Sequence, residues 1–292
     1  MTARRRLVRV PASSANLGPG YDTMAAAVSL YLELEVAERG EFALDPGGLE
    51  VSTGRDNLVV RAFEALHPAD GIAFRLSSEI PLARGLGSSA AAIVAGLSAA
   101  DHLFELALTK EELLAQATEI EGHPDNVAAA IYGGFVICGY ENDLPVAARF
   151  DPPSELEAIA VISDEELATA AAREAIPDEL PRAHVIANVS AASTLVLGLT
   201  SADFALITRG LRDSIHQPRR RRLYPRSMEI VDAAPELGAL GATISGAGPT
   251  VLVWTTVQDA GGVAAALRDR CAGWAEVRRL PFSPLGADVP EL

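Results

Sequence analysis

The stretch from Pro81 to Asp101, PLARGLGSSAAAIVAGLSAAD, places the strongest constraint on how this chain can fold. It opens with a Gly/Ser-rich turn at 85–89. The residues that follow are small and apolar at helical spacing, which predicts a helix over 90–108. A weakly alternating segment at 72–76 predicts a strand before the turn. The chain is therefore expected to pass from a strand through a glycine turn into a core helix.

A strand–turn–helix junction of this kind can bind phosphate. The first N–H groups of a helix have no partner within the helix, and they lie at the positive end of its dipole. Glycines let the backbone approach phosphate oxygens closely. The hydroxyls of Ser88 and Ser89 can cap the helix or bind Mg²⁺. No Gly-Lys-Ser/Thr follows, so the turn is not a P-loop, and taken alone it fits a plain turn with a helix cap equally well.

Two further loops favour the phosphate interpretation. The segment PASSANLGPGYD, Pro11–Asp22, is long, polar and ends in a carboxylate. The segment ISGAGPTV, Ile244–Val251, is a second Gly/Ser-rich loop with β-like surroundings. Both are predicted as loops from their turn-forming residues. Three such loops are more than turns usually require, and together they indicate nucleotide or phosphorylated-substrate binding.

Length and charge narrow the possible functions. A chain of 292 residues is expected to form one large or two fused domains. The Asn-, Asp- and Pro-rich segment Glu141–Pro153 predicts a boundary between domains at 1–150 and 151–292. The net charge of −15 argues against a nucleic-acid partner or an anionic membrane surface. Two cysteines, Cys138 and Cys271, are too few for a disulfide framework and fit a reducing cytoplasm.

Several local patterns give further expectations. Thr109 followed by Glu112 forms a capping-box pattern and predicts a helix over 109–121. Polar residues interrupt the uncharged stretch Val185–Ala202, so we expect an amphipathic helix there and no membrane span, which needs roughly 20 mostly apolar residues. The C-terminal segment FSPLGADVPEL is expected to be loosely held.

In order, the three loops resemble the three motifs of the GHMP small-molecule kinases. Two further segments, EGHPDNVAAAIYGG at 121–134 and HQPRRRRLYP at 216–225, most resemble the homoserine kinases of that family. The similarity runs from about Val8 to Thr255. It implies an α+β fold of two domains, the N-terminal one a nucleotide-binding domain like ribosomal protein S5 domain 2 and the C-terminal one ferredoxin-like. It also implies ATP-dependent phosphorylation of the L-homoserine hydroxyl to O-phospho-L-homoserine in threonine biosynthesis, by a cytoplasmic enzyme that is a possible homodimer.

The same resemblance implies which residues bind ATP and Mg²⁺. The nucleotide residues are Pro81, Arg84, Gly85, Leu86, Gly87, Ser88, Ser89, Ala90 and Asn57. Asn57 either borders the adenine or has a structural role at the start of a strand or as a helix cap. Ser89 and a helical glutamate would hold Mg²⁺. Glu121 is preferred to Glu119 because it directly precedes GHPDN, and residues two apart cannot share a helix face.

For the amino-acid substrate, the resemblance implies a pocket built from Asn16, Asp22, His123, Asn126, Arg173, Arg220 and Gly246. Asn16, Asp22 and His123 match the amine and hydroxyl side. Arg173 and Arg220 match the carboxylate side, where a planar guanidinium can bind in a bidentate manner.

Within this pocket, Asn126 is assigned to orient the hydroxyl and counts as catalytic together with Ser89 and Glu121. Its neighbour Asp125 is a possible base or a turn-capping residue. Arg219 stands where the family usually has an aromatic residue, which puts the local shape of the pocket in question.

Two other functions stay open at this stage. The segment YDTMAAAVSLY departs from the family pattern, which leaves room for a GHMP kinase acting on a different small alcohol. The scaffold is also reused for ligand sensing, which gives a non-catalytic nucleotide-binding regulator as the third possibility. The intact Ser89, Glu121 and phosphate loop argue against a regulator, because a sensor needs no metal-positioning residues.

Overall fold

The structure is a computed structural model and describes residues 4–167 and 169–290. Its strands are β1 (Arg5–Asn16), β2 (Gly20–Glu38), β3 (Ala43–Asp45), β4 (Ile72–Ser78), β5 (Phe135–Glu141), β6 (Leu144–Phe150), β7 (Leu156–Ser163), β8 (Gly241–Ile244), β9 (Val251–Thr256) and β10 (Ala275–Arg279). Its helices are α1 (Leu58–Glu64), α2 (Ser88–Phe104), α3 (Lys110–Glu121), α4 (Asp125–Tyr132), α5 (Thr169–Glu174), α6 (Arg182–Ser201), α7 (Phe204–Gly210), α8 (Gln217–Arg220), α9 (Pro225–Ala233) and α10 (Ala260–Cys271), with a 3₁₀ turn η1 (Ala234–Leu237).

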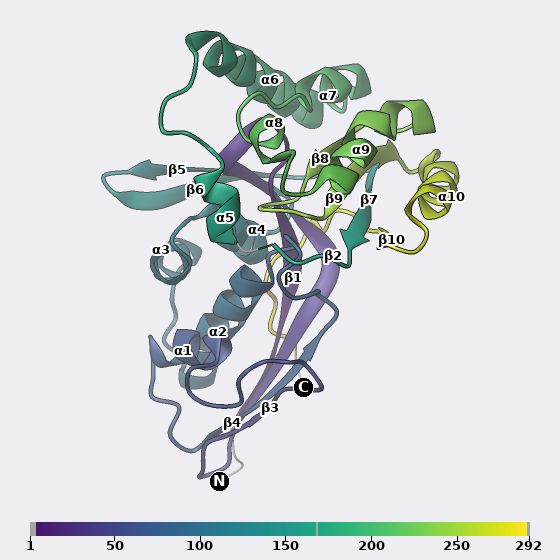
Figure 1. Cartoon of the computed structure of the whole chain (residues 1–292). Coiled ribbons are helices and arrows are strands. Elements are labelled where there is room, and N and C mark those ends of the chain that lie inside the picture. The colour runs from purple at the N-terminus through teal and green to yellow at the C-terminus, as the bar shows by residue number, and fades with distance from the viewer. Residues whose placement is uncertain (1–3, 168, 291–292) are drawn as a thin grey trace.

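The first six strands form one sheet built around β2. The strand order is β3-β4-β2-β5-β6, and β1 also pairs with β2. Along β2, apolar side chains at alternate positions such as Leu32, Leu34 and Val36 are buried, as expected for a strand with one face against a core. Helices α2 and α4 pack on β1 and β2, and α1 and α3 flank α2 (Figure 1). The larger hydrophobic core lies between these helices and the sheet.

Helix α2 fits closely in this layer because its residues are small. A Cβ atom on Gly96 would overlap the carbonyl oxygen of Val59, so α1 and α2 approach more closely than larger side chains would allow. The helix ends when Glu105 adopts a left-handed conformation, earlier than the predicted end at Leu108. Burial fixes the helix and therefore fixes its N-terminus.

The predicted capping box of α3 is confirmed. The hydroxyl of Thr109 accepts a hydrogen bond from the backbone N–H of Glu112 (3.2 Å), and the Glu112 carboxylate accepts one from the N–H of Thr109 (2.8 Å). The helix ends at Gly122, whose φ is 89°. This arrangement makes Glu121 the last residue of α3.

The first polar segment is not the long loop predicted over Pro11–Asp22. Strand β1 continues to Asn16, and the turn before β2 holds only residues 17–19. Ser13 and Ser14 are fully buried, and their backbone pairs with Ala27 and Ala26 of β2. A sequence pattern rich in Ser and Asn predicts a loop here, but pairing within the sheet satisfies the backbone and overrides that local preference.

The second sheet has the strand order β10-β7-β9-β8, and all its pairings are antiparallel. A helical segment, α5 to η1, connects β7 to β8, and α10 connects β9 to β10. This is the ferredoxin-like arrangement expected for the C-terminal domain. Helices α9 and α10 cover this sheet with a separate core. The two-domain α+β fold is therefore confirmed.

The segment predicted to mark the domain boundary, Glu141–Pro153, contains strand β6. Asn142 and Asp143, both with positive φ, form the two-residue turn of a hairpin between β5 and β6, a turn type that favours these residues. Strand β6 ends at Phe150 and β7 begins at Leu156. The domain boundary at 150/151 stays a prediction.

Helix α6 is more apolar and more exposed than expected. Its best 18-residue window has a mean hydropathy of 1.4 with 22% of the window buried, so by length and composition it could cross a membrane, although one such helix is weak evidence. This finding does not contradict the expectation that the segment is no membrane span. The hydroxyls of Ser193 and Thr194 donate to carbonyls one turn earlier, so these polar groups are satisfied inside the helix.

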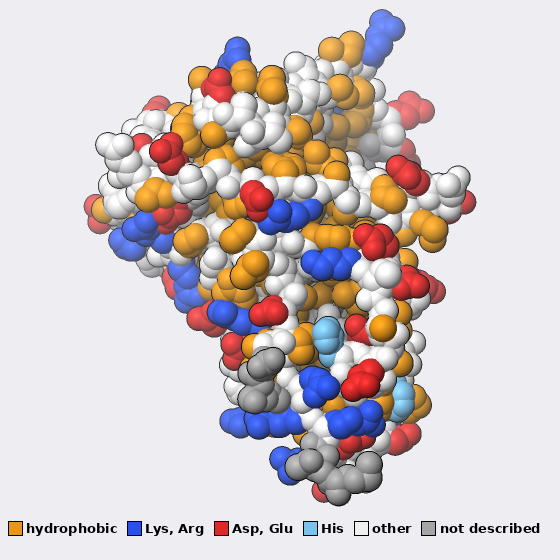
Figure 2. Space-filling view, turned by 180° about the vertical axis from the view of Figure 1, so that it is seen from behind, with side chains coloured by type: hydrophobic (Ala, Val, Ile, Leu, Met, Phe, Trp, Pro, Cys, Tyr) orange, Lys and Arg blue, Asp and Glu red, His pale blue; other side chains and the backbone are white. Residues whose placement is uncertain are grey.

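Part of the apolar surface of α6 lacks cover. Val185, Ile186, Val189 and Leu197 are 40%, 62%, 60% and 56% exposed. Figure 2, which views the molecule from behind, shows hydrophobic side chains gathered over the upper part, where Figure 1 places α6 and α7. Toward the lower part, acidic and basic side chains are interspersed (Figure 2).

The C-terminal segment is attached to the first sheet, which contradicts the prediction that it is loosely held. The backbone N–H of Ser283 donates to the carbonyl of Ala27 (2.9 Å), and its carbonyl accepts from the N–H of Gly134 (2.7 Å). Further along, the backbone of Asp288 exchanges hydrogen bonds with Arg9 (2.8 and 2.9 Å). Phe282 is only 6% exposed. The C-terminal end therefore lies against the N-terminal sheet, and both chain ends appear in the lower part of Figure 1.

Candidate active site

The three glycine- and serine-rich segments meet at one place between the two sheets. The backbone N–H of Ser13 donates to the carbonyl of Leu86 (3.2 Å). The hydroxyl of Ser245 donates to the carbonyl of Gly85 (2.6 Å). The N–H of Gly246 donates to the carbonyl of Ala15 (3.0 Å), which joins the third segment to the first. The middle loop is thus held between the end of β1 and the loop after β8.

Glycine is required at two positions of the middle loop. Gly85 and Gly87 have φ values of 78° and 68°, in the left-handed region. A Cβ atom on Gly85 would overlap the carbonyl oxygen of Ser245, and one on Gly87 would overlap the hydroxyl of Ser13. The loop can follow this path only because neither residue has a side chain.

Helix α2 starts at this loop without a side-chain cap. Its N-cap residue is Gly87, and among the described residues no side chain accepts a hydrogen bond from the first turn. Ser88 and Ser89 are the first two helical residues, so neither is the N-cap. The orphan N–H groups and the positive end of the dipole are therefore available to an anion.

Ser89 is paired with the end of α3. Its hydroxyl donates a hydrogen bond of 2.6 Å to Glu121. Burial raises the pKa of the Glu121 carboxyl, while the hydrogen bond from Ser89 acts in the opposite direction. Glu119, the alternative metal ligand, is exposed on another face of the helix. The structure places Glu121, and not Glu119, beside Ser89.

A polar cavity of about 320 Å³ opens next to this pair. All seven side chains or backbone groups predicted for the amino-acid substrate line it: Asn16, Asp22, His123, Asn126, Arg173, Arg220 and Gly246. Tyr21, Leu167 and Thr169 also line it and were not predicted. For Tyr21, its position directly before Asp22 was the available signal. The other two come from the segment around the start of α5, whose sequence carries no comparable motif.

Opposite charges face each other across one side of this cavity. The guanidinium of Arg173 on α5 makes two hydrogen bonds to the Asp22 carboxylate (3.0 and 3.1 Å). Asp22 is held by its own N–H, which donates to the side-chain oxygen of Asn16 (3.0 Å). A zwitterion could bind here by placing its ammonium at the carboxylate and its carboxylate at the guanidinium.

Arg220 lies deeper, with 2% exposure. Its Nε donates to the carbonyl of Ala172 (2.8 Å) and its Nη1 to that of Gly246 (3.2 Å). The Asn16 amide also donates to the Gly246 carbonyl (2.8 Å). The carbonyl oxygen of Gly246 therefore accepts hydrogen bonds from both the Asn16 amide and the Arg220 guanidinium.

The segment His123–Asn126 lines another side of the polar cavity. His123 and Asp125 lie 2.7 Å apart from Nδ1 to carboxylate, and this hydrogen bond raises the pKa of His123. The same carboxylate oxygen accepts from the N–H of Asn126 (2.7 Å) in the first turn of α4. The side-chain oxygen of Asn126 accepts from Ser13 (2.8 Å), which fixes its amide.

A second cavity, of about 350 Å³, is largely apolar. Its apolar lining includes Leu32, Leu49, Val51, Leu58, Leu76, Leu82 and Ala92. Asn57 also lines it while capping α1, because its side chain accepts from the N–H of Val59 (2.9 Å). The two cavities share Ala83, Ser88 and Ser89. They therefore meet at the uncapped end of α2.

Four predicted nucleotide residues line neither cavity within the described part of the chain: Pro81, Arg84, Leu86 and Ala90. Arg84 donates instead to the carbonyl of Ser163 (3.0 Å), linking the loop to the end of β7. Leu86 is 1% exposed and packs in the core. Arg219 lies outside both linings and donates to Ser214 and Ile215, so it does not reshape the polar cavity.

The comparisons with known proteins agree with this geometry. The family model for the GHMP kinases N terminal domain matches residues 57–134, and that for the GHMP kinases C terminal domain matches residues 196–273. The chain belongs to the GHMP kinase family. Membership of a kinase family implies that the chain uses ATP.

Two similar curated relatives and one solved structure are homoserine kinases. The chain is 39% identical over 254 residues to a homoserine kinase from Carboxydothermus hydrogenoformans, covering 84% of this chain and 83% of that protein. It is 40% identical over 258 residues to a homoserine kinase from Deinococcus radiodurans, covering 86% and 84%. A solved homoserine kinase from Cytophaga hutchinsonii matches with a TM-score of 0.87 and 28% identity, covering 99% and 98% of the two chains.

Proposed function

We propose that this chain is an ATP-dependent homoserine kinase that transfers a phosphoryl group to the side-chain hydroxyl of L-homoserine. The product is O-phospho-L-homoserine, an intermediate of threonine biosynthesis. The observation that carries the proposal is the meeting of the apolar and the polar cavity at Ser88 and Ser89. A nucleotide and a small charged substrate bound in these two cavities would have their reacting groups at the uncapped start of α2.

The nucleotide is assigned to the apolar side. An adenine ring suits a cavity lined by leucine and valine with Asn57 at its edge. Its phosphates would then accept hydrogen bonds from the backbone around Gly87 and from the first turn of α2. Glycine at 85 and 87 lets this backbone follow its path without side chains in the way.

The amino acid is assigned to the polar side. Asp22 and the amide of Asn16 suit the ammonium end, and Arg173 with Arg220 suits the carboxylate. The amide of Asn126, fixed by Ser13, suits the role of orienting the hydroxyl. Phosphoryl transfer depends mainly on positioning and on charge neutralisation, so a strong base is not required. The position of Asp125 at the start of α4 supports its alternative role as a helix-terminal acceptor.

Mg²⁺ is proposed as the metal, held by Ser89 and Glu121. Among the described residues no group of three or more His, Cys, Asp or Glu side chains forms a metal site. A hydroxyl and one carboxylate form a donor set that fits Mg²⁺, which usually has few protein ligands and is also coordinated by substrate phosphates. When bound, the ion would neutralise charge on the phosphates.

A coupled assay with ATP tests the function directly. We expect turnover with L-homoserine and little with mevalonate or galactose, because those alcohols do not match a site with both Asp22 and two arginines. Turnover on another alcohol with none on homoserine would replace the substrate. Nucleotide binding without phosphoryl transfer to any alcohol tested would favour a regulator.

Two further expectations accompany this proposal. A cytoplasmic location is favoured by the two buried cysteines, Cys138 and Cys271, which are unpaired thiols. A homodimer is favoured by the apolar residues exposed on α6, because apolar patches of this kind often mark contacts between proteins. Sedimentation of the purified protein tests the second, and cell fractionation tests the first.

A further inference from the structure

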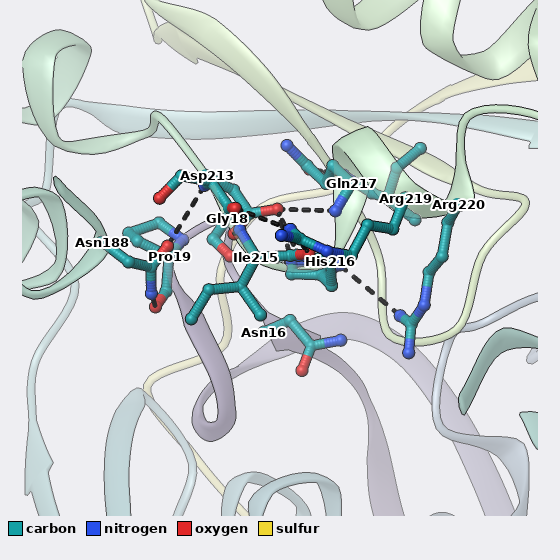
Figure 3. A network of polar contacts seen from close by, with 12 residues as sticks. Asn16, Gly18, Pro19, Asn188, Asp213, Ile215, His216, Gln217, Arg219 and Arg220 are labelled. Carbon is teal, nitrogen blue, oxygen red and sulfur yellow. Dashed lines mark hydrogen bonds and ion pairs between the residues drawn. The ribbon is translucent and has the colours of Figure 1, made fainter. Parts of the chain in front are cut away.

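His216 lies between two parts of the polar cavity without lining it. Its side chain is fully buried. The residue directly precedes α8. Its Nε2 is 2.8 Å from the carbonyl oxygen of Gly18 in the β1–β2 turn. Its Nδ1 is 3.5 Å from Nη1 of Arg220. Figure 3 shows the imidazole between the turn and the guanidinium.

These two contacts define the tautomer of His216. A carbonyl oxygen only accepts hydrogen bonds, so Nε2 carries the hydrogen. A guanidinium only donates, so Nδ1 of the ring is the acceptor for Arg220. His216 is therefore neutral in this arrangement. Burial and the nearby Arg220 charge lower the pKa of His216, although Asp213 acts in the opposite direction.

Asp213 fixes the backbone that carries the ring. Its buried carboxylate accepts hydrogen bonds from the N–H groups of Ile215, His216 and Gln217, at 2.8, 3.0 and 2.6 Å. Three charge-assisted bonds to consecutive residues leave this bend little freedom. The imidazole is consequently held in one place before any ligand binds.

The ring also shares an aromatic neighbour with Arg220. The ring centre of Tyr21 lies 5.5 Å from the ring centre of His216. It lies 5.3 Å from the guanidinium carbon of Arg220. Tyr21 directly precedes Asp22 on the same hairpin as Gly18. His216 therefore contacts both the segment that carries the proposed ammonium partner and the guanidinium proposed for the carboxylate.

We propose that His216 is a positioning residue, whose neutral imidazole holds Arg220 in the orientation that binds the substrate carboxylate and ties it to the β1–β2 turn. This inference rests on the proposed function, in which Arg220 meets that carboxylate. Hydrogen bonds to charged groups are strong enough that loss of this one is expected to change substrate affinity by about tenfold.

Two substitutions separate the two ring contacts. His216→Gln retains a donor near the Nε2 position but removes the acceptor for Arg220, whereas His216→Asn retains an acceptor near the Nδ1 position. With saturating ATP, we expect His216→Gln to raise KM for L-homoserine about tenfold with a smaller change in kcat. We also expect it to reduce the preference for L-homoserine over homoserine amide by a similar factor. His216→Asn should keep most of that preference.

Asn188 provides the matched control. Its amide donates to the carbonyl of Pro19 (2.7 Å) and its oxygen accepts from the N–H of Ser214 (3.2 Å), so it ties the same turn to the same segment. Among the described residues, Asn188 makes no hydrogen bond to Arg220. Asn188→Ala should lower the melting temperature yet leave the preference for homoserine over its amide unchanged. If Asn188→Ala and His216→Gln reduce the preference equally, or if neither does, the positioning role is overturned.

A structural measurement keeps this inference separate from the proposed function. If the unsubstituted protein does not phosphorylate homoserine, the proposed function fails. Crystal structures of the unsubstituted protein and His216→Gln then decide the positioning role. A guanidinium of Arg220 that leaves the carbonyls of Ala172 and Gly246 in the variant supports it, and an unmoved guanidinium contradicts it.

Discussion

The hydroxyl of Ser89 donates a hydrogen bond of 2.6 Å to the carboxylate of Glu121 and so joins the first turn of α2 to the last residue of α3. Both helices are also held by other contacts, α2 by burial and α3 by its capping box and Gly122. The pair is therefore set at the point where the two cavities meet before any ion or nucleotide is present.

The first prediction concerns this pair. Glu121→Gln should lower kcat at least about 100-fold and raise the Mg²⁺ concentration needed for half-maximal rate, because the proposed carboxylate ligand loses its charge. Glu119→Gln is the matched control, since it changes the same residue type two positions earlier on an exposed face. Steady-state kinetics over a Mg²⁺ series measures both. Equal loss in the two variants would remove Glu121 from the metal site.

The second prediction concerns the middle loop. Gly87→Ala should destabilise the protein by about 2 kcal/mol or more and raise KM for ATP, because the new Cβ combines a left-handed φ with overlap against Ser13. Gly40 has a φ of 86°, and a Cβ atom added there would meet nothing within 4 Å, so Gly40→Ala isolates the backbone effect at about 1 kcal/mol. Urea unfolding and ATP kinetics test the pair. An unchanged KM for ATP in Gly87→Ala would contradict the phosphate assignment.

Much of the proposed nucleotide side could be predicted from the sequence because its signals are local. Gly85 to Ser89 encode a turn and a helix start within a few residues, and the structure has both. Thr109 and Glu112 likewise encode the start of α3. The sequence alone did not reveal that Arg84 turns to Ser163, since that contact depends on the packing of β7 against the loop.

Long-range contacts explain the remaining differences. Ser13 and Ser14 look like loop residues, yet strand pairing with β2 buries them. The tail after β10 has no periodic pattern, yet backbone bonds hold Ser283 against the first sheet. The sequence around His216 shows no motif that indicates a role, because only the fold brings Gly18 and Arg220 to its two ring nitrogens. Residues that act through tertiary contacts carry no local signal.

The third prediction concerns the charge pair across the polar cavity. Arg173→Gln should raise KM for L-homoserine about tenfold or more while leaving KM for ATP unchanged, because the substrate carboxylate loses a charged partner. Stability should change little, since the Arg173–Asp22 pair is 41% and 35% exposed at its two side chains.

Arg221 provides the control for that substitution. It pairs with Asp232 through two hydrogen bonds of 2.7 and 3.0 Å on the surface, away from both cavities. Arg221→Gln removes the same charge and should leave both KM values unchanged. If the two variants behave alike, the effect of Arg173 is one of net charge and not of carboxylate binding.

The fourth prediction concerns the pH dependence of His123. Its hydrogen bond to Asp125 raises the pKa of the imidazole above the ordinary value. A group whose pKa is raised on folding adds stability that is fully present below the unfolded pKa of about 6.5 and is lost as pH rises through the folded value. Asp125→Asn removes the anion and should bring the pKa of His123 down toward its ordinary value.

NMR titration of the His123 ring in the unsubstituted protein and in Asp125→Asn measures this shift directly. Urea unfolding measured across the same pH range should show the stability difference between the two proteins shrinking as pH rises, because the imidazole becomes neutral in both. The neutral ring then gains little from the carboxylate. An Asp125→Asn variant whose His123 titrates as in the unsubstituted protein would mean that the carboxylate serves the first turn of α4, through Asn126, and not the imidazole.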